Sequence, residues 1–295
     1  MGGSSSEHEI SLLTGNAVAK GLEEAGYTVT PVMVSETDTF TLPEGTEAVF
    51  VALHGTFGED GGVQTVLEQM KMPYTASRPE SSRISFDKVL ALEAFVAAGV
   101  PVPAGYIIPH EGEIGLLELP LPVVVKPSCQ GSSVGITIVN QISEFEPAVK
   151  EARKHDKVVI VEAFIPGREW TVSVLGIDAL PIIEITPRMD GGWYSWNAKY
   201  KSGGTTGYTF PEDDVANAVV AAEVRRIALE AFKAVGAWSV GRIDFRVSPE
   251  GIPYVLELNS IPGCTENSIL PKAAAKAGIP FPILCARIME DARCG

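Results

Sequence analysis

The stretch from residue 241 to residue 259 constrains the fold most, because it has the pattern of two β-strands joined by a tight turn. Apolar and charged residues alternate along 241–247, apolar residues dominate 252–259, and Ser248-Pro-Glu-Gly251 between them consists of turn formers. If these four residues close a hairpin, Val247 faces Ile252, and the numbers of opposed residues add up to an odd number.

This register sorts the side chains of the hairpin into two faces. The core face is expected to hold Ile243, Phe245, Val247, Ile252, Tyr254, Leu256 and Leu258. The polar face is expected to hold Arg242, Asp244, Glu257 and Asn259. Two carboxylates and an amide are hard oxygen ligands, which Mg²⁺ prefers when it also binds phosphate. A solvated hairpin face with an ordinary Arg–Asp pair is the alternative interpretation.

A second candidate site is the glycine-rich stretch Lys126-Pro-Ser-Cys-Gln-Gly131-Ser-Ser-Val-Gly135, which follows an apolar strand at 122–126. Small residues let backbone N–H groups approach phosphate oxygens, and Lys126 supplies a positive charge. The stretch is not a Walker A loop, because no Gly-Lys-Ser/Thr opens a helix. A glycine-rich hairpin turn explains it equally well. The strand at 158–162 ends in Glu162, and Glu169 follows after a bend. The two glutamates could hold adenine and ribose, or the segment could be a plain strand exit.

Alternating strands and helices predict an α/β fold. In the N-terminal part, helices at 11–25 and 63–70 alternate with strands at 28–34 and 48–53, which indicates a parallel α/β domain. Further helices are predicted at 87–98, 143–154, 213–235 and 271–277, and paired strands at 171–175 and 181–185. The stretch 189–208 holds five glycines and five aromatic residues without a period, so we expect a long loop there.

The composition excludes several partners and sites. A net charge of −14 at pH 7 would repel nucleic acid and an anionic membrane, although a few local cations suffice for a nucleotide. With 295 residues, 45% of them hydrophobic, the chain suits two or three packed domains. Its four cysteines form no C-x-x-C pair, so we expect reduced thiols in a cytoplasmic protein. No apolar run approaches the roughly 18 residues of a membrane span.

Seven segments occur in one order along nearly the whole chain. They are Gly2-Gly-Ser-Ser-Ser-Glu7-His-Glu-Ile-Ser, His54-Gly-x-x-Gly-Glu-Asp-Gly61, Asp87-Lys88, Gly131-Ser-Ser-Val-Gly, Ala198-Lys199-Tyr200, Gly241-Arg-Ile-Asp-Phe and Glu257-x-Asn-x-x-Pro-Gly263-x-Thr. Together they resemble the D-alanine–D-alanine ligases of the ATP-grasp superfamily. The resemblance implies an N-terminal substrate-binding α/β domain at 1–87, a central ATP-grasp subdomain at 88–163 and a C-terminal one at 164–295.

The resemblance also implies which residues bind the nucleotide and metal. Lys88 and Lys126 would contact the phosphates and adenine of ATP. Adenine and ribose would be held by Glu162, Glu169 and the backbone of Phe164 and Ile165. Two Mg²⁺ ions, with Mn²⁺ as a substitute, would bind Asp244, Glu257 and Asn259, in agreement with the polar face of the hairpin.

For the amino-acid substrates, the resemblance implies a second set of residues. Glu7 would bind the ammonium group of the first D-alanine, with His54 nearby; a loop histidine that caps backbone groups is the alternative for His54. Arg242 and the backbone of Gly263 would hold the reacting carboxylate and stabilise the oxyanion, and Ser268 would hold the second D-alanine. The loop 189–208 would close as a lid, in which Lys199 reaches the γ-phosphate and Tyr200 joins Ser132 and Glu7.

Three interpretations stay open at this point. The first is a D-alanine–D-alanine ligase for peptidoglycan precursors, expected to be a homodimer. The second is a ligase with D-lactate or another mixed product, against which Tyr200 speaks. The third is a catalytically silent homologue, because the family's first strand precedes the Gly-Gly loop with which this chain starts. We expect such a short apolar strand upstream of Gly2 in the functional protein.

Overall fold

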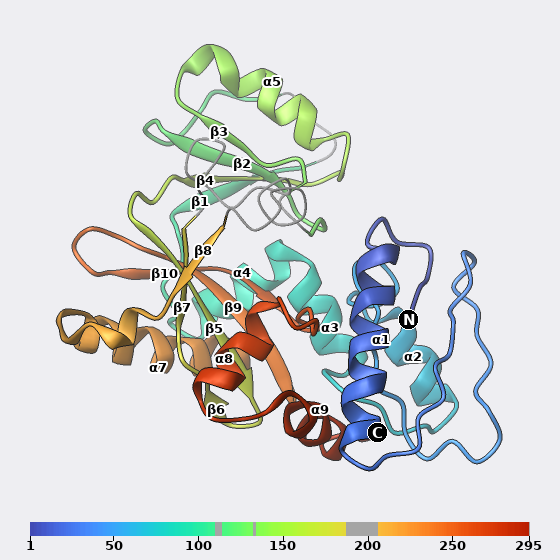
Figure 1. Ribbon diagram of the computed structural model, residues 1–295. Coiled ribbons are helices and arrows are strands. Elements are labelled where there is room, and N and C mark those ends of the chain that lie inside the picture. The colour runs from blue at the N-terminus through green and yellow to red at the C-terminus, as the bar shows by residue number, and fades with distance from the viewer. Residues whose placement is uncertain (110–113, 132–133, 187–205, 295) are drawn as a thin grey trace.

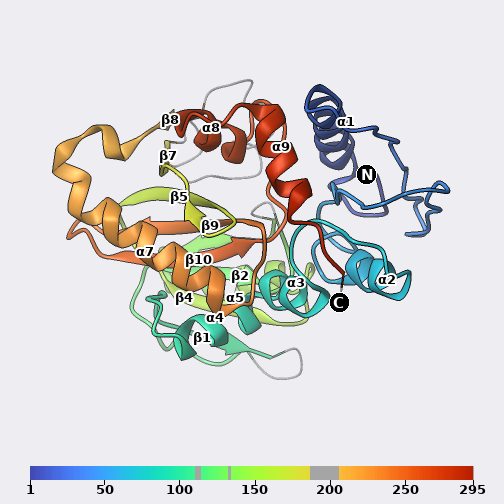
Figure 2. The same ribbon diagram turned by 90° about the horizontal axis from the view of Figure 1, so that it is seen from below.

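The computed structural model describes residues 1–109, 114–131, 134–186 and 206–294, and its elements form three groups (Figure 1). The first group contains α1 (His8–Glu24), α2 (Gly62–Gln69) and α3 (Pro79–Phe86). The second is a small sheet with one helix, and the third is a larger sheet with the remaining helices. Both views place α1 and α2 to one side of the two sheets (Figure 1 and Figure 2).

The first group differs from the parallel sheet that the sequence predicts. The two predicted helices are present as α1 and α2, whereas 28–34 and 48–53 form only isolated parallel bridges, between Gly2 and Val34 and between Val49 and Tyr74. Within the described residues no backbone–backbone hydrogen bond joins 28–34 to 48–53. Val34 is bonded instead to Met1 and Gly3, and Val49 to Pro73 and Thr75, so each segment forms a single bridge and no continuous ladder. The described residues do not test the expected strand upstream of Gly2, which stays a prediction.

The small sheet has the strand order β1-β4-β2-β3, and its neighbouring strands are antiparallel. Its elements are β1 (Gly105–Ile108), β2 (Val123–Pro127), β3 (Thr137–Val139), α5 (Ile142–Ala152) and β4 (Val159–Ala163). Helix α5 covers the outer face of this sheet (Figure 1), and its Phe145 and Val149 share a buried cluster with Val123 and Val161. The sequence predicted β2, β4 and α5, but β1 and β3 are too short to show a period.

The larger sheet has the order β10-β9-β5-β7-β8, with β6 paired to β5. Its strands are β5 (Arg168–Leu175), β6 (Asp178–Ala179), β7 (Ile183–Thr186), β8 (Gly207–Thr209), β9 (Val240–Val247) and β10 (Pro253–Asn259). Two helices, α4 (Lys88–Ala97) and α7 (Ala218–Ala234), contribute to its buried cluster. The helix predicted from residue 213 begins later, because the short 3₁₀ turns η2 (Pro211–Asp213) and η3 (Val215–Asn217) precede it.

The β9–β10 hairpin is present, but its register corrects the predicted one. Val247 pairs with Pro253, not with Ile252, and a bulge at Leu256 shifts the register by one residue. Before the bulge Val255 lies in the core, whereas Ile252 is 47% exposed, so the predicted core face is wrong in the first half of β10. After the bulge the odd sum returns, so the polar side chains lie on one face as predicted.

The C-terminal helices connect the first group to the larger sheet. Helices α8 (Ile269–Lys276) and α9 (Phe281–Glu290) bury Leu270 and Leu284 in one cluster with Leu22 of α1 and Ile183 of β7. Among the described residues no single helix is long and apolar enough to cross a membrane, while α8 and α9, bent by 105°, pass that test as a pair by length and composition alone.

Candidate active site

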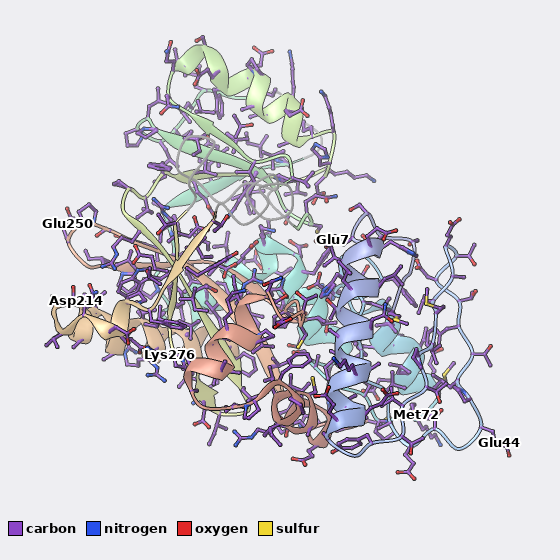
Figure 3. All side chains as sticks on the ribbon, viewed as in Figure 1. Glu7, Glu44, Met72, Asp214, Glu250 and Lys276 are labelled. Carbon is purple, nitrogen blue, oxygen red and sulfur yellow. The ribbon has the colours of Figure 1, made fainter. Side chains whose placement is uncertain are left out.

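A cleft of about 480 Å³ lies where the first group, the glycine-rich stretch and the β9–β10 hairpin meet. Of the site residues expected from the sequence, it is lined by Glu7, His54, Lys88, Arg242, Glu257, Asn259, Gly263 and Ser268. Glu7 stands at the N-terminal end of α1 (Figure 3). The cleft therefore brings together residues from all three groups of elements.

The polar face of the hairpin is a network of charged contacts. Asp244 accepts hydrogen bonds from Arg242, at 2.9 Å from Nε and 2.8 Å from Nη2, and from Thr171 Oγ1 at 2.5 Å. The bulge places Glu257 directly opposite Asp244 and Asn259 opposite Arg242. The two carboxylates and the amide thus stand side by side, as the metal hypothesis requires.

Lys88 enters this network from the start of α4. Its Nζ lies 3.2 Å from Glu257 Oε2 and donates to the backbone oxygen of Gln130 at 2.6 Å, and the side chain is buried. Asp87 fixes this position, because it caps the helix by accepting from the Val89 N–H at 3.0 Å and from Ser128 Oγ at 2.5 Å. The Asp87-Lys88 segment therefore joins α4 to the glycine-rich stretch.

The donor set suits a metal ion that shares its ligands with a phosphate. Across the described residues no group of three or more His, Cys, Asp or Glu is arranged to hold a metal ion. Asp244, Glu257 and Asn259 offer two carboxylates and one amide oxygen, so a bound Mg²⁺ would take its other ligands from phosphate and water. The Asn259 Oδ1 atom accepts from the Ile261 N–H at 3.1 Å, which orients the amide.

The two sheets face each other at the expected adenine site, where Lys126 of β2 and Glu162 of β4 form a buried ion pair at 2.8 Å. Glu162 Oε1 is buried and accepts no hydrogen bond from the described residues. The Phe164 N–H donates to Pro122 O, and the Ile165 carbonyl accepts from Arg246. Within the described part of the chain, no hydrogen bond uses the Phe164 carbonyl or the Ile165 N–H.

Arg246 was not predicted as a site residue, yet it organises this region. Its Nη1 lies 3.7 Å from Glu169 Oε2, and it donates from Nε to Ile165 O and from Nη2 to Gly167 O. Its guanidinium also lies 5.7 Å from the centre of the Phe164 ring. Strand alternation puts Arg246 on the same side of β9 as Arg242 and Asp244, but it is its contacts with 165–169 that show its role.

Glu7 lies close to two glycines of other loops. A Cβ atom added at Gly55 would lie 3.1 Å from Glu7 Oε2, and one added at Gly131 would lie 3.5 Å from the same oxygen. Gly55 also has a φ of 71°, which favours glycine. Gly55 therefore comes closer to the Glu7 carboxylate than a larger residue would fit easily, whereas at Gly131 an added Cβ would make an ordinary contact.

Glu59 is a further buried carboxyl group of the cleft, 8% exposed, that the sequence analysis did not single out. Its Oε2 accepts from the Gly55 N–H at 2.7 Å. Burial, followed by the negative charge of Glu7, raises the pKa of Glu59 to about 8, against the opposing hydrogen bond from Gly55. Glu59 could have been noticed because it lies in the His54–Gly61 segment, but no neighbouring residue in the sequence predicts that it is buried.

The loop after β10 forms the far end of the cleft. Ser268 Oγ lies 2.8 Å from Thr265 Oγ1 and accepts from the Thr265 N–H at 3.0 Å. A Cβ atom added at Gly263 would lie 3.1 Å from Ser268 Oγ, so the backbone of Gly263 and Ser268 are neighbours. The remaining predicted residues, Ser132, Lys199 and Tyr200, lie outside the described residues.

Comparisons with known proteins agree on one family. A family model described as D-ala D-ala ligase C-terminus matches residues 113–290. The D-alanine–D-alanine ligase of Methylacidiphilum infernorum is 40% identical over 289 residues, covering 98% of this chain and 92% of the relative. The enzyme of that name from Anaeromyxobacter dehalogenans is 43% identical over 296 residues, covering 99% of this chain and 94% of the relative.

Solved structures give the same result. A crystal structure of D-alanine–D-alanine ligase from Bacillus anthracis has a TM-score of 0.85 at 33% identity, covering 99% of this chain and 95% of that chain. A second one, complexed with ATP, has a TM-score of 0.83 at 30% identity and covers 99% and 94%. The two sheets and the charged cleft are those of an ATP-grasp protein. Within that superfamily, the chain belongs to the D-alanine–D-alanine ligase family.

Proposed function

We propose that the protein joins two molecules of D-alanine with the use of ATP, and so supplies the dipeptide for peptidoglycan precursors. The observation that carries this proposal is the cleft, in which Glu7, Lys88, Arg242 and Glu257 converge from separate parts of the chain. Relatives about 40% identical over nearly their full length bear the name of this activity, which favours it over a mixed-product ligase or a silent homologue.

For ATP, we infer a site between β4 and the β9–β10 hairpin. The Phe164 carbonyl and the Ile165 N–H offer an adjacent acceptor and donor, which match the amino group and ring nitrogen at the edge of adenine. Glu162 Oε1, which has no hydrogen-bond partner among the described residues, offers a further acceptor, and Glu169 is the candidate for the ribose. Lys88 and Lys126 supply positive charge, which attracts the negatively charged phosphates of ATP.

For the metal, we infer that Asp244, Glu257 and Asn259 hold two Mg²⁺ ions, for which Mn²⁺ can substitute. When bound, the ions offset the charge of the phosphoryl group during its transfer. Glu257 currently contacts Lys88 and Asp244 contacts Arg242, so both carboxylates would exchange these cations for metal. The two carboxylates lie on neighbouring strands, and β9 is paired with β5 as well as with β10, which supports their position.

The reaction follows from the chemistry of the carboxylate. It does not accept an amine at neutral pH, because oxide is a poor leaving group, so transfer of the γ-phosphoryl group first gives an acyl phosphate. The amine of the second D-alanine then attacks, and phosphate leaves. In this scheme Glu7 binds the ammonium group of the first D-alanine, and Ser268 binds the carboxylate of the second. Arg242 and the Gly263 N–H stabilise the oxyanion that forms when the amine attacks the acyl phosphate.

An acyl phosphate hydrolyses readily, so water must be excluded while it exists. We propose that the loop 189–208 serves as the lid, with Lys199 at the γ-phosphate and Tyr200 joined to Ser132 and Glu7. The division into 1–87, 88–163 and 164–295 is part of the same proposal, since it assigns amino-acid binding to the first domain and ATP to the other two. A cytoplasmic homodimer is the expected form.

A product assay tests the proposed function. The purified protein is incubated with ATP, Mg²⁺ and D-alanine, and both ADP and the dipeptide are measured. Equal amounts of ADP and D-alanyl-D-alanine are expected, with no product from L-alanine. Depsipeptide from added D-lactate at neutral pH would support the mixed-product ligase, and nucleotide binding without any product would support the silent homologue.

A further inference from the structure

Two hydroxyl side chains of α1 bind the segment that leads into the cleft. Ser11 Oγ donates to Ala52 O at 2.7 Å, and Thr14 Oγ1 lies 2.9 Å from His54 Nε2. Residues three apart lie on the same side of a helix, so Ser11 and Thr14 bind neighbouring parts of one segment. Thr14 is 1% exposed, so its hydroxyl is shielded from water. Burying a hydroxyl without a hydrogen-bond partner costs free energy of folding. The contact with His54 offsets this cost and explains why a polar residue stands here.

The surroundings of His54 also include the Ile261 backbone and three charges. The Ile261 backbone and the charge of Glu7 raise its pKa, whereas the charges of Arg242 and the Met1 amine lower it. Burial is the largest influence and lowers the pKa of His54, so the ring is neutral near pH 7. A neutral imidazole has one donor nitrogen and one acceptor nitrogen. The Ile261 backbone raises the pKa of His54, as a carbonyl that accepts from a ring N–H does. With that proton on Nδ1, Nε2 accepts from the Thr14 hydroxyl.

This arrangement joins three parts of the molecule through one ring. Thr14 belongs to α1, His54 to the loop after 48–53, and Ile261 to the loop that leads to Gly263. Ile261 is itself buried, and its N–H is held by Asn259 Oδ1. The orientation of His54 thus bears on the backbone at Gly263, where the proposed function places the reacting carboxylate.

We infer that Thr14 is a positioning residue, which fixes the orientation and tautomer of His54 and, through Ile261, the Gly263 backbone that receives the first D-alanine. The inference rests on the proposed function for the identity of the substrate, but the contact between Thr14, His54 and Ile261 does not. It also assigns His54 a supporting role in place of direct contact with the substrate, since its Nε2 binds Thr14.

The first test measures the tautomer of His54 without reference to activity. Nitrogen-15 spectra of histidine-labelled protein distinguish a protonated from an unprotonated ring nitrogen, and the His54→Asn variant assigns the signals. In the wild type we expect an unprotonated Nε2 and a protonated Nδ1 at pH 7. If the wild-type spectrum shows a charged ring or a proton on Nε2, the inference is overturned, and no variant is needed to decide it.

The second test removes the hydroxyl while keeping the shape. Thr14→Val should shift the His54 signals toward a mixture of tautomers, whereas Thr14→Ser should retain the wild-type signals. In the dipeptide assay, Thr14→Val should raise the KM for D-alanine roughly three- to tenfold, with the KM for ATP unchanged, as loss of one buried hydrogen bond implies. Thr14→Ser should restore the wild-type KM.

Thr75→Val is the matched control, because Thr75 is also buried and its Oγ1 accepts from the Val51 N–H at 3.0 Å. It loses a buried hydrogen bond of the same kind without touching His54, so it should lower stability but leave the His54 signals and the KM unchanged. Equal effects of Thr14→Val and Thr75→Val on the KM and spectra would reduce Thr14 to a general stabilising role and overturn the inference. A wild type that makes no dipeptide would refute the proposed function, and the spectra would still decide the role of Thr14.

Discussion

At the scale of single residues, the cleft and the expected adenine site contain charges paired across long stretches of chain. Lys88 contacts Glu257, and Lys126 contacts Glu162 with both side chains buried. Removing one partner of a buried pair leaves the other charge desolvated, at a cost of about 3–5 kcal/mol. Substitutions that preserve shape, such as Glu to Gln, therefore test the role of charge with the least damage to the fold.

Glu257→Gln should abolish most turnover and leave the fold intact. An amide oxygen carries no net charge to match a divalent ion, and loss of one electrostatic stabiliser costs about 10²–10³-fold in kcat. Dipeptide formation, circular dichroism and thermal melting measure the two effects separately. Glu250→Gln is the control on the same hairpin, since Glu250 lies at the turn and binds Ser248. Comparable turnover in both folded variants would show that Glu257 is not a metal ligand.

Glu59 should make the folded protein less stable as the pH rises. Its folded pKa of about 8 lies above the ordinary value of 4.5, so between these values the folded state keeps a proton that the unfolded state has lost. Stability therefore falls through this window, by up to about 5 kcal/mol at 1.36 kcal/mol per unit, and is flat above it.

Urea unfolding at pH 5 and pH 8.5 tests this dependence in the wild type and in Glu59→Gln. The glutamine keeps an oxygen for the Gly55 N–H but cannot ionise, so the variant should lose less stability between the two pH values than the wild type does. The comparison removes the contribution of other groups, because they titrate in both proteins. Equal losses would mean that Glu59 ionises normally in the folded state.

At the scale of elements, the bulge in β10 decides which side chains reach the cleft. Without it, the register of Val247 with Pro253 would continue, and Glu257 and Asn259 would point to the opposite face. Strand β5 is a second such element, since it pairs with β9 along its whole length and brings Thr171 to Asp244. The start of β5 is consequently a sensitive point.

Gly167→Ala at the start of β5 should destabilise the protein more than Gly176→Ala at its end. Both glycines have positive φ, 123° and 61°, so each substitution strains the backbone. An added Cβ at Gly167 would lie 2.1 Å from Val247 O, whereas Gly176 has nothing within 4 Å. Overpacking of this kind costs about 1–3 kcal/mol beyond the strain. Denaturant unfolding measures the difference, and equal losses would contradict the close contact of Gly167 with β9.

At the scale of the whole molecule, the inferred ATP site takes residues from both sheets. Lys126 and Glu162 lie in the small sheet, whereas Glu257 and Asn259 lie in the larger one. A ligand that contacts both sheets holds them together, so binding of nucleotide should stabilise the protein as a unit. Free ligand at 100 times its Kd adds about 2.7 kcal/mol.

A non-hydrolysable ATP analogue with Mg²⁺ should therefore raise the Tm of the wild type. Lys126→Met should reduce this rise, because the positive charge for the nucleotide is lost and Glu162 stays buried without its partner. Lys150→Met, on the exposed side of α5, should keep the full rise. The comparison is of the shift caused by ligand, so different starting stabilities do not matter. An equal shift in both variants would place the nucleotide elsewhere.

Much of the site could be predicted from short stretches of sequence. The alternation of β9 placed Arg242 and Asp244 on one face, and Asp87 indicated where α4 begins. The register of β10 could not be predicted, because a bulge shows no local signal and depends on which side chains fill the core. The segments 28–34 and 48–53 have the composition of strands, but each forms only one bridge, because a ladder needs a neighbour that stays paired over several residues, which propensity does not provide.

The sequence by itself determined the positions of most helices, the existence of the β9–β10 hairpin and the family to which the chain belongs. These depend on periodicity, capping and short motifs, which act over a few neighbouring residues. Only the tertiary structure decided that Lys88 meets Glu257, that Glu59 is buried beside Glu7, and that Thr14 holds His54. Each of these contacts joins distant segments, and its energy comes from burial and from partners that exist only once the chain has folded.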